Sequence, residues 1–118
     1  IPFDLHFSLS AMHVPHLING QTVESNQRFQ TVNPATQEVL AEVSAGGQAE
    51  VNAAVSAARE AFPKWAATPS TERAKVMRRL GELIARHVPE IARTETQDCG
   101  QTIGQTGKQL VPRAADNF

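Results

Sequence analysis

The spacing of the apolar residues changes at Gly46-Gly47, and this change limits the folds that the chain can adopt. Before the two glycines, apolar and polar residues alternate from Glu38 to Val43, a period of two that predicts a half-buried strand. After them, apolar residues recur at helical spacing, in a stripe made of Val51, Ala54, Val55, Ala58, Phe62 and Trp65. The order is therefore strands first and helices afterwards, so the chain is expected to contain both kinds of element.

The segment before this strand predicts further extended structure. Asn19-Gly20 lies between two short apolar runs and predicts a β-hairpin, because a type I′ turn needs two residues that tolerate positive φ. Phe29–Val32 is a third extended piece. Pro34 then fixes its own φ and keeps Asn33 out of the helical region, so a turn is expected there.

Three or four helices are expected after the glycines. Pro63 lies near the end of the first, and Pro69 or Ser70 begins the second. The apolar stripe of the second helix consists of Ala74, Met77, Leu80, Leu83 and Ile84.

The third helix is expected from about Pro89 to Asp98, with Gly100 just past its end. Ile103–Phe118 is expected to be helical too, kinked or begun at Pro112. A few short strands cannot cover so many amphipathic helices, so the sequence implies a further sheet in residues beyond Phe118.

Composition argues against several classes of protein. The chain is 41% hydrophobic and 19% charged, an ordinary globular balance. Its net charge is −1 with no basic stripe, so nucleic acid is not an expected partner. No apolar run approaches the length needed to cross a bilayer, so no membrane partner is expected. The single cysteine, Cys99, excludes an internal disulfide and fits a reducing compartment, so we expect a cytoplasmic location.

The two ends carry expectations of their own. Ile1–Ala11 has no basic start and too short an apolar core for a signal peptide. Because Met12 follows directly, we expect it to be the true start and residues 1–11 to be a non-native or flanking extension. No closing turn or cap follows Phe118, so we expect residues 12–118 to be an incomplete portion of a larger domain.

The reactive side chains form no catalytic pattern by themselves. Cys99 follows an acidic residue and has no histidine nearby in sequence, so a structural role is favoured over a nucleophile. None of the histidines has metal-ligand spacing, namely His6, His13, His16 and His87. Gly100, Gly104 and Gly107 follow a predicted helix rather than a strand, which favours loop and cap roles over dinucleotide binding.

A set of short motifs is more informative as an ordered series. The series is Ile18-Asn19-Gly20, Val32–Thr36, Glu38–Ala41, Ala58–Phe62 with Trp65, Glu72-Arg73, Leu83-Ile84 and Glu95-Thr96-x-Asp98-x-Gly100. In this order and at these spacings, the chain resembles the start of an NAD(P)-dependent aldehyde dehydrogenase over about a hundred of its 118 residues.

The resemblance implies the fold and the chemistry of a larger enzyme. The fold implied is α/β, and this chain would be the N-terminal part of the aldehyde dehydrogenase fold. The full enzyme would have a doubly wound NAD(P)-binding domain, a catalytic domain and an oligomerisation arm, and would form a homodimer or homotetramer. A cysteine would attack the aldehyde, hydride would pass to NAD or NADP, and a glutamate-activated water would hydrolyse the thioester. These catalytic and cofactor-binding residues would all lie beyond Phe118, so we expect the 118-residue chain alone to be inactive.

A closer resemblance is to the muconate-type semialdehyde dehydrogenases of aromatic-compound catabolism. The residues that carry it are Ala61–Trp65, Met77–Gly81, Val88–Ala92, Gln105-Thr106, Pro112–Ala114 and Asn117-Phe118. The substrate implied is a carboxylated semialdehyde, oxidised to the acid.

The resemblance also implies two groups of site residues. Family members often hold a monovalent cation with an aspartate and backbone carbonyls, which here would be Asp98, Thr31 and Val32. The alternative is that Asp98 only accepts local hydrogen bonds. The helix at the end of this stretch would line the substrate tunnel, where Arg113 and Asn117 share a face. Arginine matches a carboxylate with two donors, whereas the alternative is a surface arginine.

Two other functions remain open from the sequence. One is a dehydrogenase of another substrate, such as a betaine aldehyde enzyme, in which Arg113 would repel a cationic substrate. The other is a stand-alone helical interaction module without catalysis.

Overall fold

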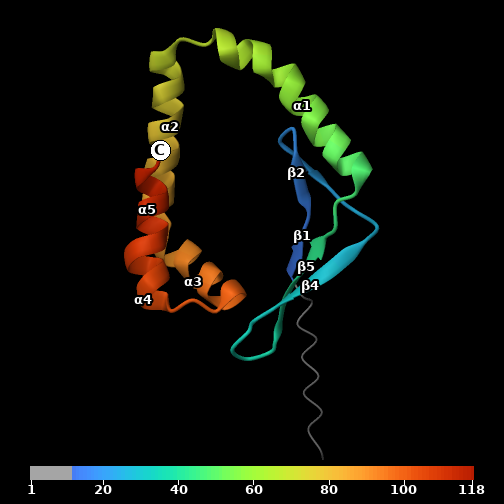
Figure 1. Cartoon of the computed structure of the whole chain (residues 1–118), viewed down its shortest axis with the longest axis vertical. Helices are drawn as coiled ribbons and strands as arrows, with labels where there is room; N and C mark the ends of the chain where they lie inside the picture. The colour runs from blue at the N-terminus through green and yellow to red at the C-terminus, as the bar shows by residue number, and fades with distance from the viewer. Residues whose placement is uncertain (1–11) are drawn as a thin grey trace, which may run out of the picture.

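The computed structural model describes residues 12–118, so the expectation for Ile1–Ala11 falls outside the described residues. The strands come first and the helices follow (Figure 1). The strands are β1 (Met12–Val14), β2 (His16–Ile18), β3 (Gln21–Val23), β4 (Arg28–Val32) and β5 (Val39–Ser44). The helices are α1 (Gln48–Ala67), α2 (Ser70–Arg86), α3 (Val88–Cys99), α4 (Ile103–Gln105), the wide turn η1 (Thr106–Leu110) and α5 (Val111–Asp116).

The strands form a three-stranded sheet and a separate hairpin. The sheet has the order β1-β5-β4, with β1 parallel and β4 antiparallel to the central strand β5. The hairpin pairs β2 with β3, and its turn residues Asn19 and Gly20 have φ values of 53° and 72°. Positive φ at both positions confirms the predicted hairpin. The strand β1 was not predicted, because its parallel partner lies far along the chain.

The pairing of β4 with β5 contains an irregularity. Thr31 pairs with Ala41 and Val32 pairs with Val39, so Leu40 has no partner in the register. An extra residue of this kind is a β-bulge, which bends the strand and interrupts the ladder of hydrogen bonds. The strict alternation predicted for this strand is therefore broken at Leu40.

The helix α1 follows directly on the glycine break. Gly47 is its N-cap residue, and the Gly47 backbone N–H donates a 2.7 Å hydrogen bond to the Glu50 carboxylate. This bond, together with the backbone N–H of Glu50 and the nearby His16, holds the pKa of Glu50 below its usual value. Pro63 lies inside the helix rather than ending it, since the helix continues to Ala67.

The helix α3 ends before Gly100, as predicted, and its end lies against the turn between β4 and β5. Gly100 adopts the left-handed conformation, with φ of 76°, and its N–H caps the Thr96 carbonyl. A Cβ atom at Gly100 would lie 2.8 Å from Pro34 Cγ, in the turn between β4 and β5. Only glycine satisfies both the backbone geometry and this close approach.

The last helical stretch is uneven. Between α4 and α5 lies η1, a π-helical turn that ends where the Val111 N–H donates to the Thr106 carbonyl, five residues earlier. Pro112 follows and has no N–H, and its ring would clash with the carbonyl four residues before it in a regular α-helix. The wide turn relieves this clash, which gives a physical cause for the predicted kink.

Buried residues lie in both halves, with Ala41 and Ser44 in β5 and the most fully covered side chains among the helices. Ala92 and Thr106 are 0% exposed, and Val111 of α5 is buried beside them. The α5 helix also crosses α2 closely, because a Cβ at Gly81 would lie 2.9 Å from the Ala115 carbonyl oxygen. The helix α1 has no buried residue, and its Phe62 is 66% exposed.

The helices α1 and α2 arch away from the sheet, and α3 leads back toward it (Figure 1). The apolar stripes of these helices stay largely uncovered within residues 12–118, with Val51, Phe62, Trp65, Val76, Leu80 and Leu83 all exposed. Among the described residues, no helix is both long enough and apolar enough to span a membrane.

The Gly100 contact yields a stability prediction. In the full-length protein, Gly100→Ala should lower the free energy of unfolding by at least about 1 kcal/mol, because the methyl group is strained at positive φ and overlaps Pro34. The matched control is Gly104→Ala, because a Cβ at Gly104 in α4 would meet nothing within 4 Å. The control should be neutral or stabilising, and urea unfolding measures both. Equal midpoints for the two variants would contradict the role given to Gly100.

Candidate functional site

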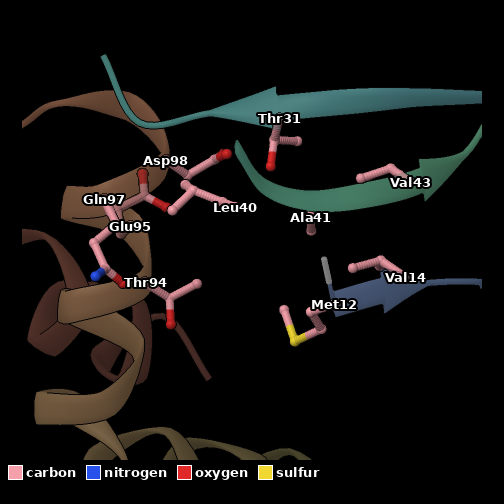
Figure 2. A pocket seen from close by; sticks show the side chains of 10 residues that line it. All are labelled: Met12, Val14, Thr31, Leu40, Ala41, Val43, Thr94, Glu95, Gln97 and Asp98. Atoms are coloured by element: carbon pink, nitrogen blue, oxygen red, sulfur yellow. The ribbon is translucent and has the colours of Figure 1, made fainter. Parts of the chain in front are cut away.

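A hollow of about 340 Å³ lies between the three-stranded sheet and the C-terminal half of α3 (Figure 2). The sheet contributes Met12, Val14, Thr31, Leu40, Ala41 and Val43 to its wall. The helix contributes Thr94, Glu95, Gln97 and Asp98. One wall is therefore mostly apolar, whereas the other is polar and carries two carboxylates.

Local structure explains why these two walls meet. Thr31 lies on β4 at the bulge, where the ladder of hydrogen bonds is interrupted. Asp98 lies in the last turn of α3, near the helix end where unpaired carbonyls concentrate negative partial charge. The approach of Gly100 to Pro34 brings this helix end to the turn that follows β4.

The structure brings together two of the three predicted cation ligands. Thr31 and Asp98 line the same hollow, whereas Val32 does not line it and is an exposed residue. Sequence reasoning missed Glu95, which lines the hollow beside Asp98. The signal was present in the spacing, because residues three apart on a helix share a face.

The charged groups in this hollow are the carboxylates of Glu95 and Asp98, and Thr31 adds a hydroxyl. Carboxylate, hydroxyl and carbonyl oxygens suit hard cations rather than soft metals. Within residues 12–118, no group of three or more His, Cys, Asp or Glu side chains is placed to hold a metal ion. A cation here would therefore need backbone carbonyls among its ligands, and the bulge opposite Thr31 leaves Leu40 of β5 without a partner in the register.

The second predicted pair lies elsewhere, on α5. Arg113 and Asn117 are both exposed, and among the described residues Arg113 has no carboxylate within ion-pair distance. Ala115 faces Gly81 of α2, and residues two apart on a helix point in nearly opposite directions. Arg113 therefore lies on the side of α5 that faces away from α2, where its guanidinium is available to another molecule or another part of the protein.

The remaining candidates have local roles. The Cys99 thiol is exposed and donates to the Glu95 backbone carbonyl at 2.9 Å. Gly104 and Gly107 lie in α4 and η1, in helical turns rather than in a loop after a strand. Of the three glycines, only Gly100 has the expected cap role, whereas Gly104 and Gly107 lie inside helical turns and not in the expected loop.

Most of the ordered motifs lie in a region that matches a known protein family. The model of the aldehyde dehydrogenase family matches residues 22–118. The chain belongs to the aldehyde dehydrogenase family. The predicted family is thus confirmed, and the second helix, the third helix and the final stretch all lie within the matched region.

Curated relatives of the family include semialdehyde dehydrogenases. The chain is 59% identical to the 5-carboxymethyl-2-hydroxymuconate semialdehyde dehydrogenase of Escherichia coli over 105 residues, which are 89% of this chain and 22% of that protein. It is 40% identical to the 2-aminomuconic semialdehyde dehydrogenase of Danio rerio over 86% of this chain and 21% of that protein. The predicted resemblance to the muconate-type subgroup is therefore confirmed. The chain spans about a fifth of the length of these relatives.

Solved structures agree with this assignment. HpcC of Thermus thermophilus matches with a TM-score of 0.85 and 41% identity, over 89% of this chain and 21% of that one. An aldehyde dehydrogenase of Bacillus cereus, solved as an NAD+ complex, matches with a TM-score of 0.85 and 34% identity, over 89% of this chain and 22% of that one. The predicted α/β class, as the N-terminal part of the aldehyde dehydrogenase fold, is confirmed.

The contacts of Cys99 generate a prediction for the full-length protein. Cys99→Ser should keep the turnover of aldehyde within about twofold of the parent, because a serine hydroxyl can still donate to the Glu95 carbonyl. Steady-state kinetics with a semialdehyde measures this. Loss of more than about a hundredfold, as expected for a missing nucleophile, would give Cys99 a catalytic role instead.

Proposed function

We propose that residues 12–118 form the incomplete N-terminal portion of the NAD(P)-binding domain of an aldehyde dehydrogenase. Its substrate would be a carboxylated, muconate-type semialdehyde, oxidised to the acid in aromatic-compound catabolism. The observation that carries this proposal is the 59% identity to a muconate-type semialdehyde dehydrogenase over 89% of the chain.

The position of Arg113 supports the class of substrate. A muconate-type semialdehyde carries a carboxylate at a distance from its aldehyde carbon, and this group needs a partner in the binding site. Arg113 is an exposed guanidinium with no carboxylate partner among residues 12–118, on the outer face of α5. Its planar fork can donate two parallel hydrogen bonds to one carboxylate, and Asn117, one turn further on, can donate a third.

The chemical step itself would use residues beyond Phe118. In the proposed reaction, a cysteine thiolate would add to the aldehyde to give a thiohemiacetal, loss of hydride to the cofactor would leave a thioester, and water would then release the acid and the free thiol. NAD or NADP supplies the acceptor for the hydride, and NAD is supported by the Bacillus cereus relative solved in its NAD+ complex. On this proposal the chain alone neither binds NAD nor oxidises aldehydes.

The hollow at Asp98 would hold a monovalent cation. Its donors would be the Asp98 carboxylate with the backbone carbonyls of Thr31 and Val32, as a hard cation requires. The bulge supports this assignment because it interrupts the pairing of β4 with β5 between Thr31 and Val32, whereas Val32 itself lies outside the hollow. The cation would join the end of α3 to β4 and so stabilise the approach of these elements.

We also propose that the full-length enzyme is a cytoplasmic homodimer or homotetramer. A betaine-aldehyde-type enzyme is the alternative within the family, and a cationic substrate would be repelled by the guanidinium of Arg113. A stand-alone helical module does not account for the family match over residues 22–118.

The role of Arg113 can be tested in the full-length enzyme. Arg113→Ala should lower kcat/KM for a carboxylated semialdehyde by at least about tenfold, because hydrogen bonds to charged groups contribute about 1.5–3 kcal/mol each. Turnover of an uncharged aliphatic aldehyde should change little. Arg113→Lys should recover only part of the loss, because a point charge cannot reproduce the fork.

The matched control is Arg86→Ala, which removes an exposed arginine from the last turn of α2. It should leave both substrates unaffected. Equal losses on the two substrates in Arg113→Ala would show that Arg113 holds the helix in place and does not bind the substrate.

The cation can be tested without turnover. Potassium chloride should raise the thermal unfolding midpoint of the parent above that in choline chloride at equal ionic strength, because a ligand that binds only the native state stabilises it. Asp98→Asn should lose this difference, and Glu60→Gln on exposed α1 should keep it. A parent that unfolds at the same temperature in both salts would count against the cation.

A further inference from the structure

A pair of threonine hydroxyls lies where α3 meets η1, and neither has a part in the proposed function. Thr96 Oγ1 lies 2.8 Å from Thr106 Oγ1, and Thr106 is 0% exposed. Ala92, one turn before Thr96, is also 0% exposed, and a Cβ at Gly107 would lie 3.7 Å from Ala92 Cβ. The helix α3 and the turn η1 are therefore in close contact around this pair of hydroxyls.

The direction of these hydrogen bonds follows from their acceptors. Thr106 Oγ1 also lies 3.3 Å from the carbonyl oxygens of Thr102 and Ile103, which can only accept. The single Thr106 hydroxyl proton is therefore used toward the carbonyls, and Thr96 donates its own proton to Thr106 Oγ1. Each hydroxyl has a partner, so the buried pair is fully satisfied.

This satisfied pair resists rotation of η1 about its axis. Turning the helix would separate Thr106 from Thr96 and leave a buried hydroxyl without its donor, at a cost comparable to desolvation of a polar group. Apolar contacts alone resist such rotation less, because they have no required direction. The pair therefore sets the direction in which the following helix presents its side chains.

The following helix is the one that carries Arg113. The Thr106 carbonyl accepts the N–H of Val111, the first residue of α5, so the helix starts from a group that the threonine pair holds. Arg113 lies seven residues after Thr106, about two helical turns. The close crossing of Gly81 with Ala115 limits the distance between α5 and α2, whereas the threonine pair limits rotation.

We propose that Thr96 and Thr106 act as positioning residues that aim the guanidinium of Arg113 at the distal carboxylate of the substrate. The inference rests on the proposed function, in which Arg113 binds that carboxylate. The pair touches no substrate, and it contributes to selectivity for carboxylated over uncharged aldehydes only through Arg113.

The experiment measures kcat and KM of the full-length enzyme with a carboxylated semialdehyde and with an uncharged aliphatic aldehyde. Thr106→Val keeps the shape and removes the hydroxyl, and it should lower the ratio of the two kcat/KM values by about threefold to tenfold. The loss should appear mainly as a raised KM for the carboxylated substrate. Thr106→Ser should restore the ratio, and Thr96→Val, at a half-buried position, should reproduce the loss.

Two controls separate positioning from a general effect on folding. Thr68→Val removes a hydroxyl that donates to the Lys64 carbonyl at the end of α1, far from this junction, and should leave the ratio unchanged. In the double variant Thr106→Val/Arg113→Ala, the ratio should equal that of Arg113→Ala alone, because the pair acts only through Arg113.

Three results would overturn the inference. An unchanged ratio in Thr106→Val and Thr96→Val, beside a lowered ratio in Arg113→Ala, would refute the positioning role and leave the proposed function standing. Equal losses on both substrates in the threonine variants would show a structural role only. A parent-like ratio in Arg113→Ala would refute the proposed function and this inference together.

Discussion

The approach of Gly100 to Pro34 is the constraint on which the arrangement of this chain depends. It is where the end of α3 meets the turn between β4 and β5, after α1 and α2 have led the chain far from the sheet (Figure 1). A side chain at Gly100 would both strain the backbone and overlap the proline ring. This contact lies next to the hollow that the carboxylates of α3 share with Thr31.

The helix α3 connects the two candidate sites. Its last turn carries Asp98 toward the sheet, and two residues earlier Thr96 is bonded to the buried hydroxyl of Thr106. Through η1 and α5, the same helix supports Arg113. A change in the position of α3 would therefore move both Asp98 at the hollow and Arg113 on α5.

Local patterns predicted most of the elements. The Asn19-Gly20 turn, the start of α2 at Ser70 and the end of α3 before Gly100 depend on residues adjacent in sequence, whose backbone preferences act wherever they occur. The strand β1 and the unpaired Leu40 could not be found in this way, because both depend on pairing between distant segments. Pro63 lies near the end of α1 as predicted, and the helix accommodates it and continues to Ala67.

The sequence by itself determined the family, the order of strands and helices, and the residue types available for each candidate site. These follow from short-range preferences and from motifs in a fixed order, which need no knowledge of contacts. Only the tertiary structure decided that Thr31 shares a hollow with Asp98 and Glu95, while Val32 does not line it. It also decided that Thr106 is buried against Thr96, and that Arg113 lies on the face of α5 away from α2. The physical reason is that the bulge and the wide turn change the direction of the side chains that follow them, and that the two glycine contacts join segments distant in the sequence.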